Sequence, residues 1–85
     1  MKEIRILGIY VNDRVKEASK IQPILTRYGC SIRTRLGLHG IDDIYAVNTG
    51  LIILEFVGSM EEFQRLENEL LGIDQLEVKK MIFHK

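Results

Sequence analysis

The chain has 85 residues, of which 46% are hydrophobic and 28% are charged, and its 12 Lys and Arg balance its 12 Asp and Glu. This length predicts one domain over residues 1–85, and so high a hydrophobic fraction excludes a disordered chain. A chain with balanced charge lacks the positive field that attracts nucleic acid, so direct binding to nucleic acid is not expected. No apolar run approaches the roughly 20 residues that span a bilayer, so a membrane is not expected as a partner either.

Residues 4–11 form the first predicted strand, and both of its alternating faces are largely apolar, as in a central strand covered on both sides. Gly8 within it marks the close approach of another element, and we expect a helix to cross there. A helical pattern follows, with apolar residues at Val15, Ala18, Ile21, Ile24, Leu25 and Tyr28. Pro23 removes a backbone hydrogen bond to Ser19, which predicts a kink or a frayed side near Ser19.

The second predicted strand, residues 32–38, has a half-buried pattern that is typical of a peripheral strand. Ile32, Thr34, Leu36 and Leu38 alternate with Arg33, Arg35 and Gly37. The segment 39–49 is longer than a hairpin loop of the usual about 2–5 residues, and it carries several apolar side chains. We expect this segment to pack against another part of the protein and to serve a function or an interface.

Residues 50–57 form the third predicted strand, which is apolar on both faces except at Glu55. Ser59 and Glu62 match a capping box, in which the hydroxyl and the carboxylate each accept from the other residue's backbone N–H. The helix that follows has an apolar stripe at Met60, Phe63, Leu66 and Leu70, and Gly72 closes it.

The last predicted strand covers residues 76–83, and a shift in its alternation predicts a bulge at Lys79 and Lys80. The order strand, helix, strand, strand, helix, strand is that of the ferredoxin-like βαββαβ fold of the α+β class. This fold predicts a four-stranded antiparallel sheet in the order 4-1-3-2, with two helices on one face. The two strands that are apolar on both faces are then the central ones.

The polar residues of the strands predict which face of the sheet turns away from the helices. Arg5, Arg33, Arg35 and Glu55 are assigned to the outward face, where Glu55 can pair with Arg33 or Arg35. The face toward the helices then carries Ile4, Ile6, Gly8, Tyr10, Ile32, Leu36, Leu38, Ile52, Leu54 and Phe56. The outward face still carries a patch that is large for a monomer, and its members are predicted to be an oligomer interface: Leu7, Ile9, Val11, Leu51, Ile53 and Val57.

Five short segments, in a fixed order, carry a resemblance to a known family. They are Ile9-Tyr10-Val11-Asn12-Asp13-Arg14, Tyr28-Gly29, Arg33-Thr34-Arg35-Leu36-Gly37-Leu38, Asn48-Thr49-Gly50-Leu51-Ile52 and Leu71-Gly72-Ile73. In them the chain resembles an ACT-like domain, and more narrowly the small iron-only hydrogenase system regulators, which are related to the C-terminal domain of nickel-responsive repressors. The resemblance covers nearly the whole chain.

The resemblance implies a regulatory or sensor domain that works as a homodimer or homotetramer without catalysis, including a role as a transcriptional regulator. It also implies a small ligand such as an amino acid, bound near the turn from the first strand to the first helix at a subunit interface. That turn is Asn12, Asp13 and Arg14 in this chain, and it lacks the glycine that the family usually has there. The metal-binding pattern of the nickel repressors is not matched.

Two groups of residues are candidate ligand-binding sites. Asn12, Asp13 and Arg14 can present helix N-terminal N–H groups to an anion, and the alternative is that they only cap the helix. Arg33 and Arg35 can clamp an acidic ligand or partner, and the alternative is a solvated strand face paired with Glu55.

No metal, cofactor or catalytic site is expected. His39, His84 and Cys30 are scattered without ligand-type spacing, and no nucleophile, base and orienting group occur together. The single cysteine excludes an internal disulfide, Cys30 is expected to be a small buried hydrophobe, and the N-terminus lacks a signal-peptide layout. These features favour the cytoplasm.

Two other functions fit the same fold, namely RNA binding and a pure protein-interaction module. An RNA-binding sheet needs aromatic side chains on its open face, whereas the assignment above turns Tyr10 and Phe56 inward. If the faces were exchanged, these two rings would point outward and RNA binding would gain support.

Overall fold

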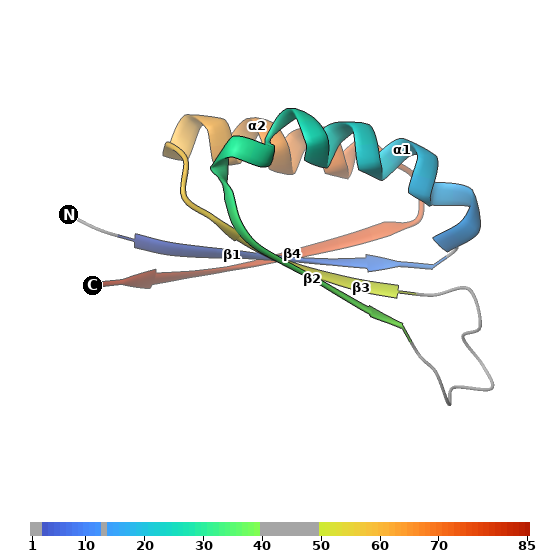
Figure 1. Ribbon diagram of the computed structural model, residues 1–85, viewed down its shortest axis with the longest axis horizontal. Coiled ribbons are helices and arrows are strands. Elements are labelled where there is room, and N and C mark those ends of the chain that lie inside the picture. Colours follow the sequence, from blue (N-terminus) through green and yellow to red (C-terminus); the bar gives the residue numbers. More distant parts are fainter. Residues whose placement is uncertain (1–2, 13, 40–49) are drawn as a thin grey trace.

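The computed structural model describes residues 3–12, 14–39 and 50–85, with only the backbone described at 14–18, 38 and 39. Its elements are β1 (Glu3–Val11), α1 (Arg14–Arg27), the 3-10 helix η1 (Gly29–Ser31), β2 (Ile32–His39), β3 (Gly50–Phe56), α2 (Met60–Leu71) and β4 (Leu76–His84). The strands form one antiparallel sheet in the order β2-β3-β1-β4. Both helices lie on the same face of this sheet (Figure 1). The fold is therefore the predicted ferredoxin-like α+β arrangement.

The strand β1 lies at the centre of the sheet and pairs with both β3 and β4. Its ladder with β4 runs from Glu3↔His84 to Val11↔Leu76, and its ladder with β3 runs from Arg5↔Phe56 to Val11↔Gly50. At the start of β1, Glu3 and Ile4 thus extend past the end of β3. The predicted packing of the segment 39–49 falls outside the description, which gives only the backbone of residue 39.

The predicted facing of β1 is wrong. Leu7, Ile9 and Val11 are buried beneath the helices, so Ile4, Ile6, Gly8 and Tyr10 lie on the opposite face. The polar residue that misled the prediction is Arg5, which sits on the helix side at the end of the sheet. Its guanidinium donates to the Gly58 carbonyl at 2.6 Å and to Glu3 Oε1 at 3.1 Å, so this charge is satisfied without turning away from the helices.

The predicted facing of β2 is correct at Ile32, which packs against the core, and is wrong after it because a bulge interrupts the alternation. The register with β3 shifts between Ile32 and Thr34, which makes Arg33 an extra residue. After the bulge, Arg35 lies opposite buried Leu54 on the helix side, and Leu36 lies half exposed on the other face. The facing of β3 is as predicted, with Leu54 and Phe56 buried and Ile52 packed against the core.

The predicted bulge in β4 is absent, since β4 pairs with β1 in one continuous register. Leu76 and Val78 pack against the core, whereas Met81 and Phe83 point to the opposite face. Lys80 stands on the helix side opposite Leu7, and its ammonium lies 3.2 Å from Glu67 Oε1 of α2. Lys80 therefore occupies a position on the helix side because its long side chain carries the charge to the edge of the core. A charged residue at this position interrupts the apolar alternation of β4, which is why the sequence suggested a bulge.

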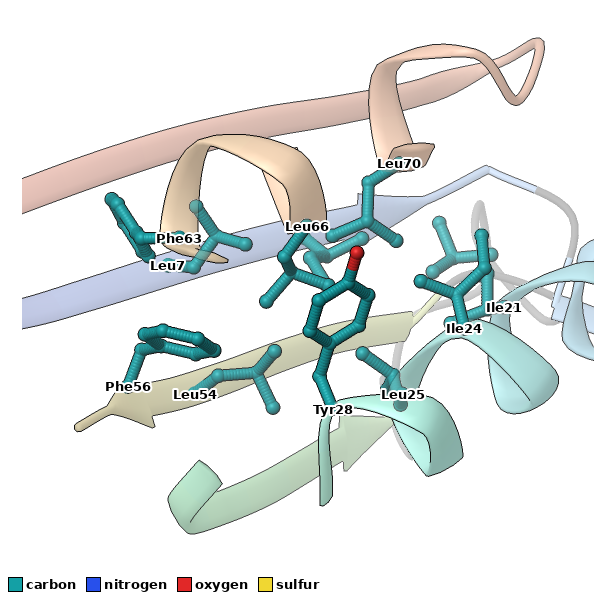
Figure 2. Close-up of a cluster of buried hydrophobic side chains, with 12 residues drawn as sticks. Leu7, Ile21, Ile24, Leu25, Tyr28, Leu54, Phe56, Phe63, Leu66 and Leu70 are labelled. Atoms are coloured by element: carbon teal, nitrogen blue, oxygen red, sulfur yellow. The ribbon is translucent and has the colours of Figure 1, made fainter. Parts of the chain in front are cut away.

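The core is one layer of side chains between the helices and the sheet (Figure 2). Its members come from β1, α1, β3 and α2, with Tyr28 directly after α1: Leu7, Ile9, Val11, Ile21, Ile24, Leu25, Tyr28, Leu54, Phe56, Phe63, Leu66 and Leu70. The rings of Phe56 and Phe63 pack at a centroid distance of 5.4 Å. These helical residues are among those predicted from spacing, while the side chains of Val15 and Ala18 lie outside the description. The kink near Ser19 stays a prediction.

The turn from β3 into α2 joins the two layers. Ser59 is the N-cap of α2, and its hydroxyl accepts from the Glu62 N–H at 3.1 Å, as half of the predicted capping box requires. The Glu62 carboxylate instead accepts from the Ser31 hydroxyl of η1 at 2.8 Å. The start of α2 is therefore tied to the start of β2, and Gly72 closes the helix as predicted.

The predicted helix crossing at Gly8 is also wrong, because Gly8 faces away from both helices. A Cβ added there would meet Ile53 Cδ1 at 3.7 Å and the Lys79 carbonyl oxygen at 3.9 Å. The neighbour that approaches Gly8 is thus the side chain of Ile53 on β3.

Candidate interaction face and polar sites

The sheet face that lies away from the helices, called here the open face, is largely apolar. Its apolar residues, assigned by register and alternation, are Ile4, Ile6, Tyr10, Leu36, Leu51, Ile53, Met81 and Phe83. Met81, Phe83 and Leu36 are each at least 50% exposed. A small domain rarely presents such a contiguous apolar surface to water without a use for it.

The six residues predicted as an oligomer interface lie on both faces of the sheet. Leu51 and Ile53 lie on the open face, and Val57 is exposed just beyond the end of β3. Leu7, Ile9 and Val11 belong to the core beneath the helices, so they are not available to a partner. The β1 residues that lie on the open face are instead Ile4, Ile6 and Tyr10.

Arg33 and Arg35 do not form a clamp. Arg33 Nε lies 4.0 Å from Glu55 Oε1, and this carboxylate also accepts from the Thr34 hydroxyl at 3.2 Å on the open face. Arg35 donates to Gln22 Oε1 of α1 at 2.6 Å on the helix side. The bulge at Arg33 separates the two guanidinium groups, which the alternation of the sequence had placed together.

Among the turn residues, the structure locates the side chain of Asn12. Its Nδ2 donates to the Gln75 carbonyl at 3.1 Å, which ties the turn after β1 to the turn before β4. Asp13 lies outside the described residues, and Arg14 begins α1 with only its backbone described. The Asn12 amide thus has a structural partner, and the predicted anion site at this turn stays a prediction.

A hollow of about 360 Å³ lies where β1 extends past β3. It is lined by Glu3, Ile4, Arg5, Arg33, Glu55, Phe56, Val57 and Lys85. Three cationic side chains and two carboxylates share this space, and Arg5 is already held by Glu3 and Gly58. Sequence reasoning missed the hollow because its residues come from the ends of four strands that only the fold brings together.

A polar cluster joins the ends of the two helices. The Tyr28 hydroxyl, which points from the end of α1 toward α2 (Figure 2), donates to the Glu69 carboxylate, and Arg27 pairs with the same carboxylate. The hydrogen bond to Glu69, together with burial, raises the pKa of Tyr28 above its usual 10.0. This cluster fixes the packing of α1 against α2.

Tyr28→Phe should lower the unfolding free energy by about 1 kcal/mol at neutral pH, because it removes one hydrogen bond. Since folding raises the pKa of Tyr28, this stabilisation is complete below pH 10.0 and is lost as the pH rises through the folded-state pKa. Urea unfolding at pH 7 and at increasing alkaline pH should show the two proteins converging. Tyr10→Phe, which removes a tyrosine hydroxyl outside this cluster, is the control for the substitution itself. A gap for Tyr28→Phe that persists at all pH values would contradict the assignment.

The described residues test two further predictions, which concern metal ligands and Cys30. Within 3–12, 14–39 and 50–85, no three His, Cys, Asp or Glu side chains gather in a way that could hold a metal ion. Cys30 is exposed in η1, so the prediction that it is a buried hydrophobe is wrong. Neither described helix is long and apolar enough to cross a membrane.

The antiparallel sheet in the order β2-β3-β1-β4, with α1 and α2 on one face, defines a ferredoxin-like domain. Among solved structures, an uncharacterized protein from Thermotoga maritima, TM1266, is similar. It matches with a TM-score of 0.82 and 23% sequence identity, over 98% of this chain and 100% of its own. At this identity the likeness shows a shared fold alone. No family model and no curated protein matches the chain.

Proposed function

We propose that the protein is a non-catalytic regulatory or sensor domain that acts as a homo-oligomer. The observation that carries this proposal is the open face, on which all four strands place exposed or half-buried apolar side chains. Burial of such a surface against an identical surface is the simplest way to remove it from water, because a symmetric dimer needs only one kind of patch.

The regulatory part of the proposal is supported by the resemblance of the chain to the ACT-like regulators of iron-only hydrogenase systems. The fold itself hosts many activities and does not select among them. In this proposal the protein works in the cytoplasm, and a small ligand such as an amino acid alters its assembly. An effect on transcription would pass through a DNA-binding partner.

Solution mass and thermal shifts test the two parts of this proposal separately. Light scattering at micromolar to millimolar concentrations should give the mass of a dimer or tetramer, and a strict monomer would contradict self-association. A screen of amino acids, nucleotides and divalent metals should find a compound that raises the melting temperature, since a ligand at 100 times its Kd adds about 2.7 kcal/mol. If no compound does so, the sensor part fails and a pure interaction module takes its place.

One observation favours RNA binding as a second function. Tyr10 and Phe83 lie on the open face, where rings can stack on bases. Phe56 is buried, however, and Leu51 and Ile53 occupy the corresponding face of the central strand β3. The aliphatic centre favours contact with another protein surface. A salt-dependent mobility shift with single-stranded RNA would support the RNA function instead.

A further inference from the structure

We propose that two copies of the chain pack open face to open face along a diagonal apolar band, with the charged corners of the sheet left at the rim. This inference rests on the homo-oligomer part of the proposed function and names the surface and the partner. The partner is a second copy of this chain, and the contact is symmetric.

The diagonal follows from the cross-strand register. On the β4 side, the apolar residues lie near the start of β1, where Phe83 is opposite Ile4 and Met81 is opposite Ile6. On the β3 side they lie near the end of β1, where Leu51 is opposite Tyr10 and Ile53 is opposite Gly8. Leu36 of β2 continues the band beside Ile53. The band therefore crosses all four strands from one corner of the sheet to the other.

The two remaining corners are charged. Beside the start of β1, on the β3 and β2 side, Glu55 pairs with Arg33 at 4.0 Å. At the opposite corner, on β4, Glu77 pairs with Lys79 at 3.6 Å. Burial of these four charges would cost more than their pairing returns, unless further hydrogen bonds satisfied them. An arrangement that superimposes the two bands and keeps these corners in water avoids that cost.

The centre of the band has a shape that admits a close partner. Gly8 carries no side chain, and Ile53 Cδ1 lies 3.7 Å from the place where a Cβ of residue 8 would stand. The side chain of Ile53 thus lies over the backbone of β1 at Gly8, and no side chain of residue 8 projects from the middle of the face. Two such faces can approach to about 10 Å, the usual spacing of sheets that pack face to face.

The size of the band predicts a weak dimer. Tyr10 is 37% exposed, and Leu36, Met81 and Phe83 are each 50–54% exposed. Since a large aromatic side chain carries roughly 150–250 Å², the band presents on the order of 500 Å² per copy. Two copies would bury about 1,000 Å², below the roughly 1,200–2,000 Å² of stable interfaces. The dimer should therefore dissociate in the micromolar range, where a ligand or partner can shift its population.

Sedimentation equilibrium of the whole chain tests this proposal with Ile53→Lys, Met81→Lys and Leu71→Lys. Ile53 lies at the centre of the band, and Met81, which is 54% exposed, accepts a lysine with little risk to the monomer. Leu71 is the matched control, since it is 56% exposed on α2 behind the sheet. Both band variants should raise the dimer Kd at least tenfold, whereas Leu71→Lys should leave it within twofold. Far-UV circular dichroism of each variant checks that the fold is intact.

The outcomes separate this proposal from the broader one. If the wild type associates and a folded Met81→Lys variant keeps the same Kd, the band is not the interface, although self-association stands. A loss of association in Leu71→Lys alone would place the interface on the helices and overturn the proposal. A wild type that remains monomeric at millimolar concentration would overturn both proposals.

Discussion

Leu7→Ala should lower the unfolding free energy by about 2–5 kcal/mol, whereas Ile6→Ala, one residue earlier on β1, should cost the monomer less than half as much. Leu7 is 0% exposed and lies opposite Leu54 beneath the helices, so its truncation leaves a cavity. Ile6 lies on the open face and keeps part of its surface in water. Because a domain of this size has only about 5–15 kcal/mol of stability, Leu7→Ala should also increase the fraction of unfolded chains at room temperature.

Urea unfolding followed by circular dichroism measures both variants, at a protein concentration low enough to keep the monomer. This neighbouring pair is its own control, since both changes remove aliphatic groups from the same strand. The opposite order of costs would mean that β1 faces the other way, as Arg5 had indicated in the sequence. In that case Ile6 would leave the open face and the diagonal band would lose its β1 residues.

Gly58→Ala should lower the unfolding free energy by about 1–3 kcal/mol, through overpacking at the turn from β3 to α2. A Cβ at this position would stand 2.7 Å and 2.9 Å from two atoms of the Phe56 ring and would also meet the Glu62 carboxylate. The end of Glu62 can swing aside, but Phe56 is buried and packed against Phe63. The turn must therefore move, and with it the Gly58 carbonyl that accepts from Arg5.

Gly37→Ala on β2 is the matched control, because a Cβ there meets nothing within 4 Å. It should leave stability unchanged or raise it by about 0.5–1 kcal/mol, since alanine loses less backbone entropy than glycine. Differential scanning calorimetry gives the comparison, and each 1 kcal/mol should shift Tm by roughly 4–8 °C in a domain of this size. Equal effects of the two substitutions would show that the space beside Phe56 is not limiting.

The order of the elements and the order of the strands were predictable, because strands that are apolar on both faces must lie inside the sheet. The same property prevented a prediction of how β1 faces, since alternation carries no information when both faces are apolar. Arg5 was the only polar guide, and it stands at the end of the sheet, where its charge reaches Glu3 and a free carbonyl. No feature of the local sequence predicts the bulge at Arg33. The direction in which the β2 side chains point after the bulge could therefore not be predicted either.

The candidate sites were less predictable than the fold, because residue type alone does not reveal long-range partners. Arg35 meets Gln22 and Asn12 meets the Gln75 carbonyl only once the layers have packed. The hollow at the start of β1 likewise depends on where β3 leaves the sheet. The apolar character of the open face was predictable, because the sheet has more apolar residues than two helices can cover.

The pairing of β1 with β4 along its whole length also affects how the chain folds during synthesis. These strands lie far apart in the sequence, so their ladder closes a long loop, and folds with such distant contacts form slowly. During synthesis β1 must wait for β4 to leave the ribosome, while β2, β3 and α2 are already present. Phe83 and Met81 of β4 form one end of the diagonal band, so the band is complete only after β4 has joined the sheet. We expect nascent chains to be unable to associate through the whole band until β4 has joined the sheet.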